Sequence, residues 1–266
     1  MGACALRRHG GRDCADWVAE RLPQLLAAKL LGVSASAAVK EAIKDAFVAC
    51  DLELLELCRA RGWCDGCCVI GVFFDRQCTP ARAYCANLGD SRAFAACSTG
   101  GGTTRAVPLS KDHTALDAKE RKRIVAAGGY VEAGRLCGSI EVSRSLGDVR
   151  LKAHGMSAVP DVTSFSIGPE QRFVVLGCDG LWNKLSGQQL VDMLEQRIPR
   201  MDSRRHELAL LFSKPSELSG LTKDAMSSLT KERDSTNEEA ILRSLVHEAV
   251  HEHKATDNVS VLLVRL

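Results

Sequence analysis

The stretch Phe173-Val174-Val175-Leu176-Gly177-Cys178-Asp179-Gly180-Leu181-Trp182 is a short apolar run that ends in a single carboxylate. A run of this kind bounded by glycine predicts a buried β-strand, so Asp179 would lie where the strand meets a loop. Burying an unpaired carboxylate costs on the order of several kcal/mol, so Asp179 is expected to hold a hydrogen-bond network or a cation. Near the end of the chain, Asp257 in Thr256-Asp257-Asn258 opens a second apolar run in a similar way.

Two amphipathic helices are predicted in the N-terminal part of the chain. Apolar residues recur at helical spacing from Asp13 to Leu30. Ser34 can cap a second helix that runs to about Arg59. We expect both helices to cover one face of a sheet.

Short β-rich runs follow, separated by Asp/Gly turns and by Gly100-Gly101-Gly102. This pattern predicts an antiparallel meander. The expected strands are residues 68–74, 82–87, 92–97 and 104–108.

The second half alternates further helices with strands, so helices would cover both faces of a β core. Residues 199–236 are polar and rich in Ser, Lys and Glu, and we interpret them as a surface insertion or mobile linker within a single domain of residues 1–266. The charged face Lys119-Glu120-Arg121-Lys122-Arg123 predicts a solvated helix surface. The expected helices are 119–127, 187–196 and 238–252, and the expected strands are 130–132, 162–167, 173–176 and 259–264.

The composition indicates one large globular domain with an apolar core, since 45% of the 266 residues are hydrophobic. The chain has 35 basic and 33 acidic residues, a balance that favours neither nucleic acid nor an acidic membrane surface as a partner. Most of the 12 cysteines lie in apolar stretches, which is typical of reduced thiols in a cytoplasmic or nuclear protein. No apolar run approaches the roughly 20 residues that a membrane-spanning helix needs. We also expect the protein to be a monomer.

Four more motifs join those around Asp179 and Asp257: His9-Gly10-Gly11, Asn87-Leu88-Gly89-Asp90-Ser91-Arg92, Lys111-Asp112-His113 and Glu141-Val142-Ser143-Arg144-Ser145-Leu146-Gly147-Asp148. In this order the six motifs resemble the metal-dependent protein phosphatase 2C family, and most closely its integrin-linked-kinase-associated branch. The resemblance implies an α+β fold, a four-layer α-β-β-α sandwich of two antiparallel sheets flanked by helices. It also implies hydrolysis of phosphoserine or phosphothreonine in a phosphoprotein by metal-activated water.

The resemblance implies a metal site that holds Mn²⁺ or Mg²⁺, hard cations that prefer oxygen ligands. Asp179 and Asp257 match the family's direct ligands, and Gly180 is the neighbouring backbone position. Asp112 matches a position that, with Asp179, holds a further and looser metal. Capping of the following helix is an equally open reading of Asp112.

Other matched residues have roles beside the metals. His9 matches the histidine that protonates the leaving oxygen, a task for a side chain that titrates near neutral pH; the alternative is an exposed loop residue. Arg144 and Asp148 match a flap beside the active site, where they would brace the segment to Pro160 or face the substrate. Asp90 and Arg92 are expected to tie a hairpin turn together.

The N-terminus departs from the family pattern. Arg7 stands where the metal-bridging Asp belongs, and Arg8 stands where a Gly belongs. A guanidinium cannot coordinate a metal, so the second metal site should be lost. Only eight residues precede His9, so we expect the family's first strands, with an Arg for phosphate and a Glu-Asp pair, to be absent.

Two other motifs suggest different chemistry. His247, Glu248 and His251 fit the His-Glu-x-x-His pattern of zinc peptidases, although no third ligand follows them. Cys64 and Cys67 resemble a redox pair, but they precede a strand instead of opening a helix. The main hypothesis is therefore a metal-dependent serine/threonine phosphatase of impaired activity, the alternative is a pseudophosphatase that binds phosphoproteins, and a zinc peptidase is a remote third.

Overall fold

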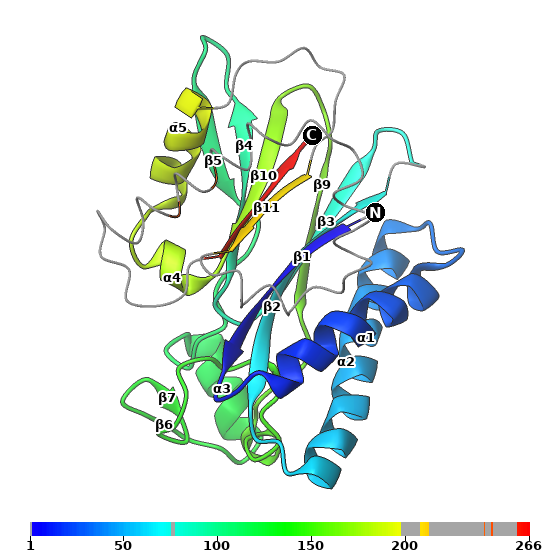
Figure 1. Cartoon of the computed structure of the whole chain (residues 1–266), viewed down its shortest axis with the longest axis vertical. Coiled ribbons are helices and arrows are strands. Elements are labelled where there is room, and N and C mark those ends of the chain that lie inside the picture. Colours follow the sequence, from blue (N-terminus) through cyan, green and yellow to red (C-terminus); the bar gives the residue numbers. More distant parts are fainter. Residues whose placement is uncertain (1, 76–77, 198–207, 213–241, 243–245, 247–259) are drawn as a thin grey trace.

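The computed structural model describes residues 2–75, 78–197, 208–212, 242, 246 and 260–266. Two antiparallel sheets of five strands each form the centre of this part of the chain, and helices pack against them (Figure 1). The predicted α+β class with two antiparallel sheets is thereby confirmed. No helix in the described ranges is long and apolar enough to cross a membrane.

The first sheet has the strand order β1-β2-β3-β9, and a short strand, β8, also pairs with β2. All of these neighbours are antiparallel. The sequence analysis did not predict strand β1. The bounds are β1 Gly2–His9, β2 Gly66–Asp75, β3 Arg82–Leu88, β8 Leu146–Gly147 and β9 Asp161–Ser166.

The second sheet has the order β11-β12-β10-β4-β5, again with antiparallel neighbours. Its central strand, β10, is the apolar run that ends before Asp179, as the sequence predicts. The bounds are β4 Arg92–Ser98, β5 Thr104–Pro108, β10 Gln171–Gly177, β11 Leu208–Phe212 and β12 Ser260–Arg265.

The expected four-stranded meander is wrong in one respect. Strands β2 and β3 pair with each other, and so do β4 and β5, but β3 and β4 belong to different sheets. The tight connection Gly89-Asp90-Ser91 therefore carries the chain from one sheet to the other. This crossing places Asp90 at the junction between the two sheets.

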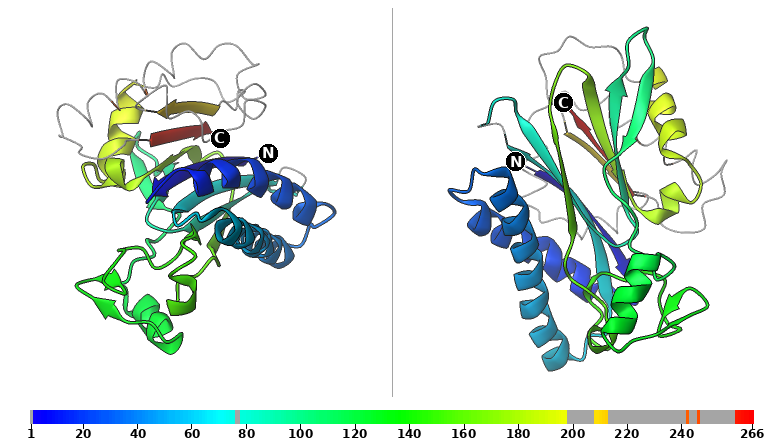
Figure 2. Two further views of the ribbon diagram at one scale, coloured as in Figure 1. Left: turned by 60° about the horizontal axis from the view of Figure 1, so that its bottom comes forward. Right: turned by 180° about the vertical axis from the view of Figure 1, so that it is seen from behind.

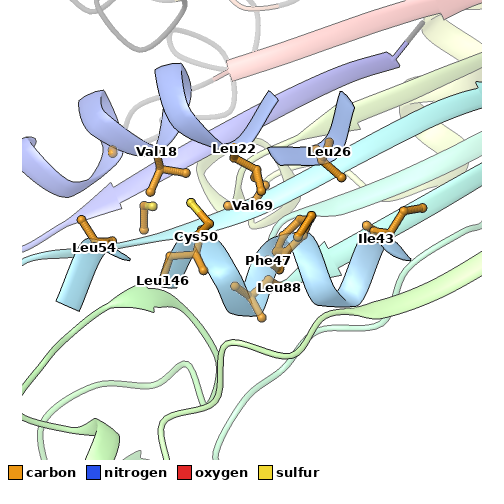
Figure 3. Close-up of a cluster of buried hydrophobic side chains, with 14 of the residues drawn as sticks. Val18, Leu22, Leu26, Ile43, Phe47, Cys50, Leu54, Val69, Leu88 and Leu146 are labelled. Atoms are coloured by element: carbon orange, nitrogen blue, oxygen red, sulfur yellow. The ribbon is translucent and has the colours of Figure 1, made fainter. Parts of the chain in front are cut away.

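Helices α1 (Asp13–Leu30) and α2 (Ser36–Arg61) cover the outer face of the first sheet. Their apolar stripes pack on alternate residues of β2 and β3, and Figure 3 shows this cluster. The expected cap at Ser34 is wrong. Helix α2 begins at Ser36, so its N-cap residue is Ala35, which makes no side-chain capping hydrogen bond. The labelled members of the cluster are Val18, Leu22, Leu26, Ile43, Phe47, Cys50, Leu54, Val69, Leu88 and Leu146.

Two further apolar clusters complete the core. One joins the remaining faces of the two sheets, with Ile70 and Val72 of β2 packed with Val174 and Leu176 of β10. The other lies between the second sheet and helices α4 (Asp179–Trp182) and α5 (Gly187–Arg197). Figure 2 shows α1 and α2 on one side of the sheets and α5 on the other.

A smaller unit connects β5 with β9 at one end of the molecule (Figure 1). It contains helix α3 (Ala118–Ala126), the two-stranded sheet of β6 (Val131–Glu132) and β7 (Arg135–Leu136), strand β8 and the 3₁₀ turn Lys152–His154. Ile124, Leu136, Val142 and Met156 form part of its apolar centre.

Several expectations concern residues outside the described ranges. Asp257, His247, Glu248 and His251 are among them, and so is most of the helix expected at 238–252. Within residues 199–236 the structure describes only strand β11, an apolar run that the sequence analysis did not single out. The interpretation of the rest as a surface insertion stays a prediction.

Candidate functional site

The end of strand β1 carries two polar side chains on the same face. Cys4 and Leu6 pack with the helices, whereas Ala5 packs in the cluster between the sheets. Because residues along a strand alternate between faces, Arg7 and His9 lie on the side of Ala5, toward the second sheet. His9 is thus a strand residue, and the alternative of an exposed loop residue is wrong.

Arg7 binds two carboxylates that are remote in sequence. Its Nη1 donates a hydrogen bond to Oδ2 of Asp90 at 2.7 Å, and its Nε lies 2.6 Å from Oδ1 of Asp179. All three side chains are mostly buried, with 23%, 15% and 17% of their surfaces exposed. The guanidinium therefore bridges the two carboxylates.

Local geometry fixes Asp179 at the end of β10. The backbone N–H of Gly180 donates to Oδ1 of Asp179 at 2.9 Å, and the indole N–H of Trp182 donates back to the carbonyl of Gly177 at 2.7 Å. A Cβ atom at Gly177 would lie 2.7 Å from a methyl group of Leu181, so this turn requires glycine for close approach. The motif is consequently a strand-to-helix corner that presents one carboxylate.

A second ion pair lies beside the first. Arg92, the first residue of β4 and the ladder partner of Gly177, forms a bidentate pair with Asp112 at 2.9 and 2.8 Å. The hydrogen bonds to Asp112 are the largest cause that raises the pKa of Arg92. Burial lowers this pKa, and the nearby negative charges of Asp90 and Asp179 raise it further. Asp90 and Arg92 therefore bind other partners instead of tying their own turn together. Capping by Asp112 is also wrong, because Asp117 caps α3.

These contacts decide whether the described residues fit a metal centre. In the described part of the chain no three His, Cys, Asp or Glu side chains are grouped as metal ligands would be. Asp179 and Asp112, the two expected ligands that the structure describes, are each paired with an arginine. A cation beside Asp179 would meet the positive charge of Arg7, so the described residues do not fit the paired metal site that the resemblance implies.

His9 is held by a carboxylate from another segment. Its Nε2 lies 2.6 Å from Oδ2 of Asp148, which also accepts a hydrogen bond from the hydroxyl of Ser145. The other ring nitrogen, Nδ1, is buried and has no hydrogen-bond partner among the described residues. A Cβ atom at Gly66 would lie 2.3 Å from the carboxylate of Asp148, so close packing of β1, β2 and this loop sets the pair.

Asp148 lies at a strained backbone position. Its φ of 51° is in the left-handed region, which Asp and Asn tolerate better than most residues. Its N–H donates to the carbonyl of Asp65, whose carboxylate accepts from the N–H of Cys14 at the start of α1. These contacts hold Asp148 against His9, and its substrate-facing role stays a prediction.

Arg144 braces the small unit, as expected from the sequence. Its guanidinium donates to Glu120, to Asp161 at 2.9 Å and to the carbonyl of Val159 at 2.9 Å. Nε2 of His113 lies 3.2 Å from Oδ2 of Asp161, and this contact is the largest cause that holds the pKa of Asp161 well below its usual range; Arg144 lowers it further. This network fixes the segment that leads to β9.

Glu120 is the site residue that sequence reasoning missed. It lies in the charged run of α3 that predicted a solvated face, yet it is only 4% exposed. Its carboxylate accepts hydrogen bonds from Arg144, Arg123 and Ser143. The three-residue spacing to Arg123 was a usable signal for one of these partners, while Ser143 and Arg144 lie far along the chain.

Cys64 and Cys67, which resemble a redox pair in sequence, are interpreted from the sequence instead as a loop that runs into a core strand. Cys64 is exposed, whereas Cys67 is fully buried in β2, and both are free thiols. The preference for a loop that runs into a core strand is confirmed.

Comparison with known proteins agrees with this fold and these motifs. The family model described as "Protein phosphatase 2C" matches residues 3–234. The integrin-linked kinase-associated serine/threonine phosphatase 2C of Bos taurus is 33% identical over 268 residues, covering 97% of this chain and 64% of the relative. The probable protein phosphatase 2C 8 of Arabidopsis thaliana is 33% identical over 204 residues, covering 71% of this chain and 56% of the relative.

Solved structures show the same fold at lower identity. A serine-threonine phosphatase 2C from Toxoplasma gondii superposes with a TM-score of 0.72 at 19% identity, covering 99% of this chain and 84% of that chain. A C. elegans sex determining protein gives a TM-score of 0.76 at 19% identity, covering 99% and 56%. The chain spans between about half and two thirds of the length of the first curated relatives it matches. On its sequence and its fold, the chain belongs to the protein phosphatase 2C family.

Proposed function

We propose that this chain recognises proteins phosphorylated on serine or threonine and, as it stands, hydrolyses the phosphoester very slowly or not at all. The observation that carries the proposal is the position of Arg7 between Asp90 and Asp179, at 2.7 and 2.6 Å. Family membership supports the class of partner, a phosphoprotein. The paired carboxylates support the loss of turnover, because each is neutralised by the chain itself.

Hydrolysis of a phosphoester requires an activated water, compensation of the phosphoryl charge and an acid for the leaving oxygen. In the family, Mn²⁺ or Mg²⁺ supplies the first two. The described residues of this chain do not fit that requirement, since Asp112 and Asp179, the matched carboxylates within the described ranges, each bind an arginine. In the part of the chain that the structure describes, a site for the cation that would compensate the phosphoryl charge is therefore missing.

The contacts of His9 also support slow or absent turnover, because they leave this histidine badly placed to act as the acid for the leaving oxygen. One ring nitrogen is 2.6 Å from Asp148 and the other is buried. A general acid must reach the oxygen that it protonates, directly or through one water. In this arrangement the imidazole serves to hold Asp148 and β1 together.

The α-β-β-α layering expected of the family is part of this proposal. Three separate apolar clusters support it, one under α1 and α2, one between the sheets and one under α4 and α5. In such a fold the small unit with Arg144 would form the flap beside the bound phosphopeptide.

The test combines binding and turnover. A phosphothreonine peptide should bind the chain, the unphosphorylated peptide should bind more weakly, and added Mn²⁺ should not raise the release of phosphate above the rate without protein. Equal binding of the two peptides overturns the recognition. Robust manganese-dependent release that Asp179→Asn abolishes overturns the loss of turnover.

A second candidate is an active phosphatase that uses Mn²⁺ or Mg²⁺. The retention of Asp179, Asp112, His9 and Asp148 near the same sheet ends favours it. If the N-terminal departure from the family pattern alone causes the defect, replacing Arg7-Arg8 by Asp-Gly in a chain that also carries the family's N-terminal strands should raise hydrolysis by several orders of magnitude. Asp179→Asn should then remove that gain, whereas a restored protein without activity supports the first candidate.

A further inference from the structure

The ion pairs of Arg7 connect the two sheets. Arg7 belongs to β1 of the first sheet, Asp90 lies in the turn that leads from the first sheet to the second, and Asp179 follows β10 of the second sheet. The 2.7 Å contact with Asp90 is a charge-assisted hydrogen bond, and the 2.6 Å contact with Asp179 is a close ion pair. A single guanidinium thus spans the junction at which the sheets meet.

Carboxylates gathered at such a junction need a positive charge. Asp90 and Asp179 are both mostly buried, and neighbouring buried carboxylates repel one another unless a cation compensates them. Arg92 compensates the nearby Asp112 in the same manner. The described cluster therefore contains three carboxylates and two guanidinium groups, with the guanidinium of Arg7 shared between two of the carboxylates.

We propose that Arg7 is a built-in counter-ion, which performs for this fold the structural task of a bound divalent cation. The stability of the chain then does not depend on divalent metal. This inference goes beyond the proposed function, because it holds whether or not the chain hydrolyses phosphoesters.

A corollary concerns the site that Arg7 fills. Replacing Arg7 by Asp would add a third carboxylate beside Asp90 and Asp179 and remove the opposing positive charge. Three oxygen donors of this type suit a hard divalent ion such as Mn²⁺. The variant should therefore depend on metal for a stability that the original chain has without it.

The first experiment uses the unchanged chain. Its thermal unfolding midpoint is measured after treatment with a chelator, and then with millimolar Mn²⁺ or Mg²⁺. The midpoint should be the same in all three conditions within about 1 °C, since a ligand stabilises only when it binds the folded state. A midpoint that falls with chelator and recovers with Mn²⁺ overturns the proposal.

The second experiment removes the cation. Arg7→Met should lower the midpoint by several degrees, because it leaves Asp90 and Asp179 buried without that charge. Adding Asp90→Asn and Asp179→Asn to Arg7→Met should recover most of the loss. An unchanged midpoint in Arg7→Met, or no recovery in the triple variant, contradicts a counter-ion role and indicates that Arg7 acts by packing alone.

The third experiment tests the corollary with a matched control. Arg7→Asp should unfold at a lower temperature in chelator and gain several degrees with Mn²⁺. Arg135→Asp makes the same charge change at a pair whose side chains are 45% and 69% exposed, and it should gain nothing. Equal gains in both variants reveal non-specific metal binding and refute the site. If Arg7→Asp does not fold even with Mn²⁺, the corollary is refuted, and the first two experiments still decide the proposal.

Discussion

Replacing Glu120 by Gln tests whether the buried ion network of α3 holds the small unit together. The carboxylate of Glu120 is 4% exposed and accepts hydrogen bonds from Arg144 at 2.6 Å and from Arg123 and Ser143 at 2.7 Å. Burial alone would raise the pKa of Glu120, but the hydrogen bonds from Arg144, Arg123 and Ser143 outweigh it and lower the pKa from 4.5 to about 2. The change to Gln keeps the shape of the side chain and removes this charge.

The magnitude follows from that pKa. At about 1.4 kcal/mol per pKa unit, the fall from 4.5 to about 2 corresponds to about 3 kcal/mol of stability at neutral pH. Removing one partner of a buried ion pair costs about 3–5 kcal/mol, which agrees. For a domain of this size, Glu120→Gln should lower the unfolding midpoint by roughly 6–12 °C.

The effect should depend on pH with a definite sign. The pKa of Glu120 is lower in the folded chain than in the unfolded chain, so its contribution is complete above about pH 4.5 and disappears as the pH falls toward about 2. We expect urea unfolding from about pH 7 to about pH 3 to show that the free energies of unfolding of the original chain and of Glu120→Gln differ by a constant amount near neutral pH. The difference should narrow below about pH 4.5.

The control is Glu141→Gln, which removes an ion pair with Arg135 whose glutamate side chain is 69% exposed. Exposed pairs contribute about 0–1 kcal/mol, so this variant should hardly change the free energy of unfolding. If Glu120→Gln is no more destabilised than the control, or if its deficit stays constant down to about pH 3, the network does not stabilise the fold as argued.

Three further predictions concern other positions. Gly66→Ala would place a Cβ 2.3 Å from the carboxylate of Asp148 and 2.8 Å from Nε2 of His9. Urea unfolding should therefore show that the free energy of unfolding falls by about 1–3 kcal/mol. An unchanged free energy of unfolding would show that the loop around Asp148 moves aside without cost. Because the φ of Asp148 is 51°, Asp148→Asn should be more stable than Asp148→Ala by about 1 kcal/mol in the same assay, and the reverse order would contradict the backbone argument. Zinc should not co-purify in stoichiometric amount through His247 and His251, as elemental analysis would show; a full equivalent that is lost in His251→Ala would support the peptidase alternative.

Much of the fold was predictable from local patterns. The apolar run before Asp179, the strand at Thr104–Pro108 and the helix from Asp13 to Leu30 lie where the sequence predicts them. Each of these elements depends on side chains that are neighbours along the chain, so period and turn residues suffice to find it. The family resemblance rests on motifs of the same local kind, and the comparisons confirm it.

The sequence did not predict how these elements are assigned to sheets. The turn at Gly89-Asp90-Ser91 is compatible with a hairpin, but the chain uses it to pass between two sheets. Strand β11 was missed because five apolar residues inside a polar segment form no long pattern. Pairing of strands depends on surface buried elsewhere in the fold, which no local window contains.

The sequence by itself determined that an arginine stands where the family pattern has a carboxylate, and that this residue cannot bind a metal. Only the tertiary structure decided what Arg7 does instead. Its partner Asp90 lies 83 residues away, and the two meet because β1 and the β3–β4 turn end at the same junction of the sheets. Electrostatic contacts depend on distance in space and on burial, and the packing of the sheets sets both.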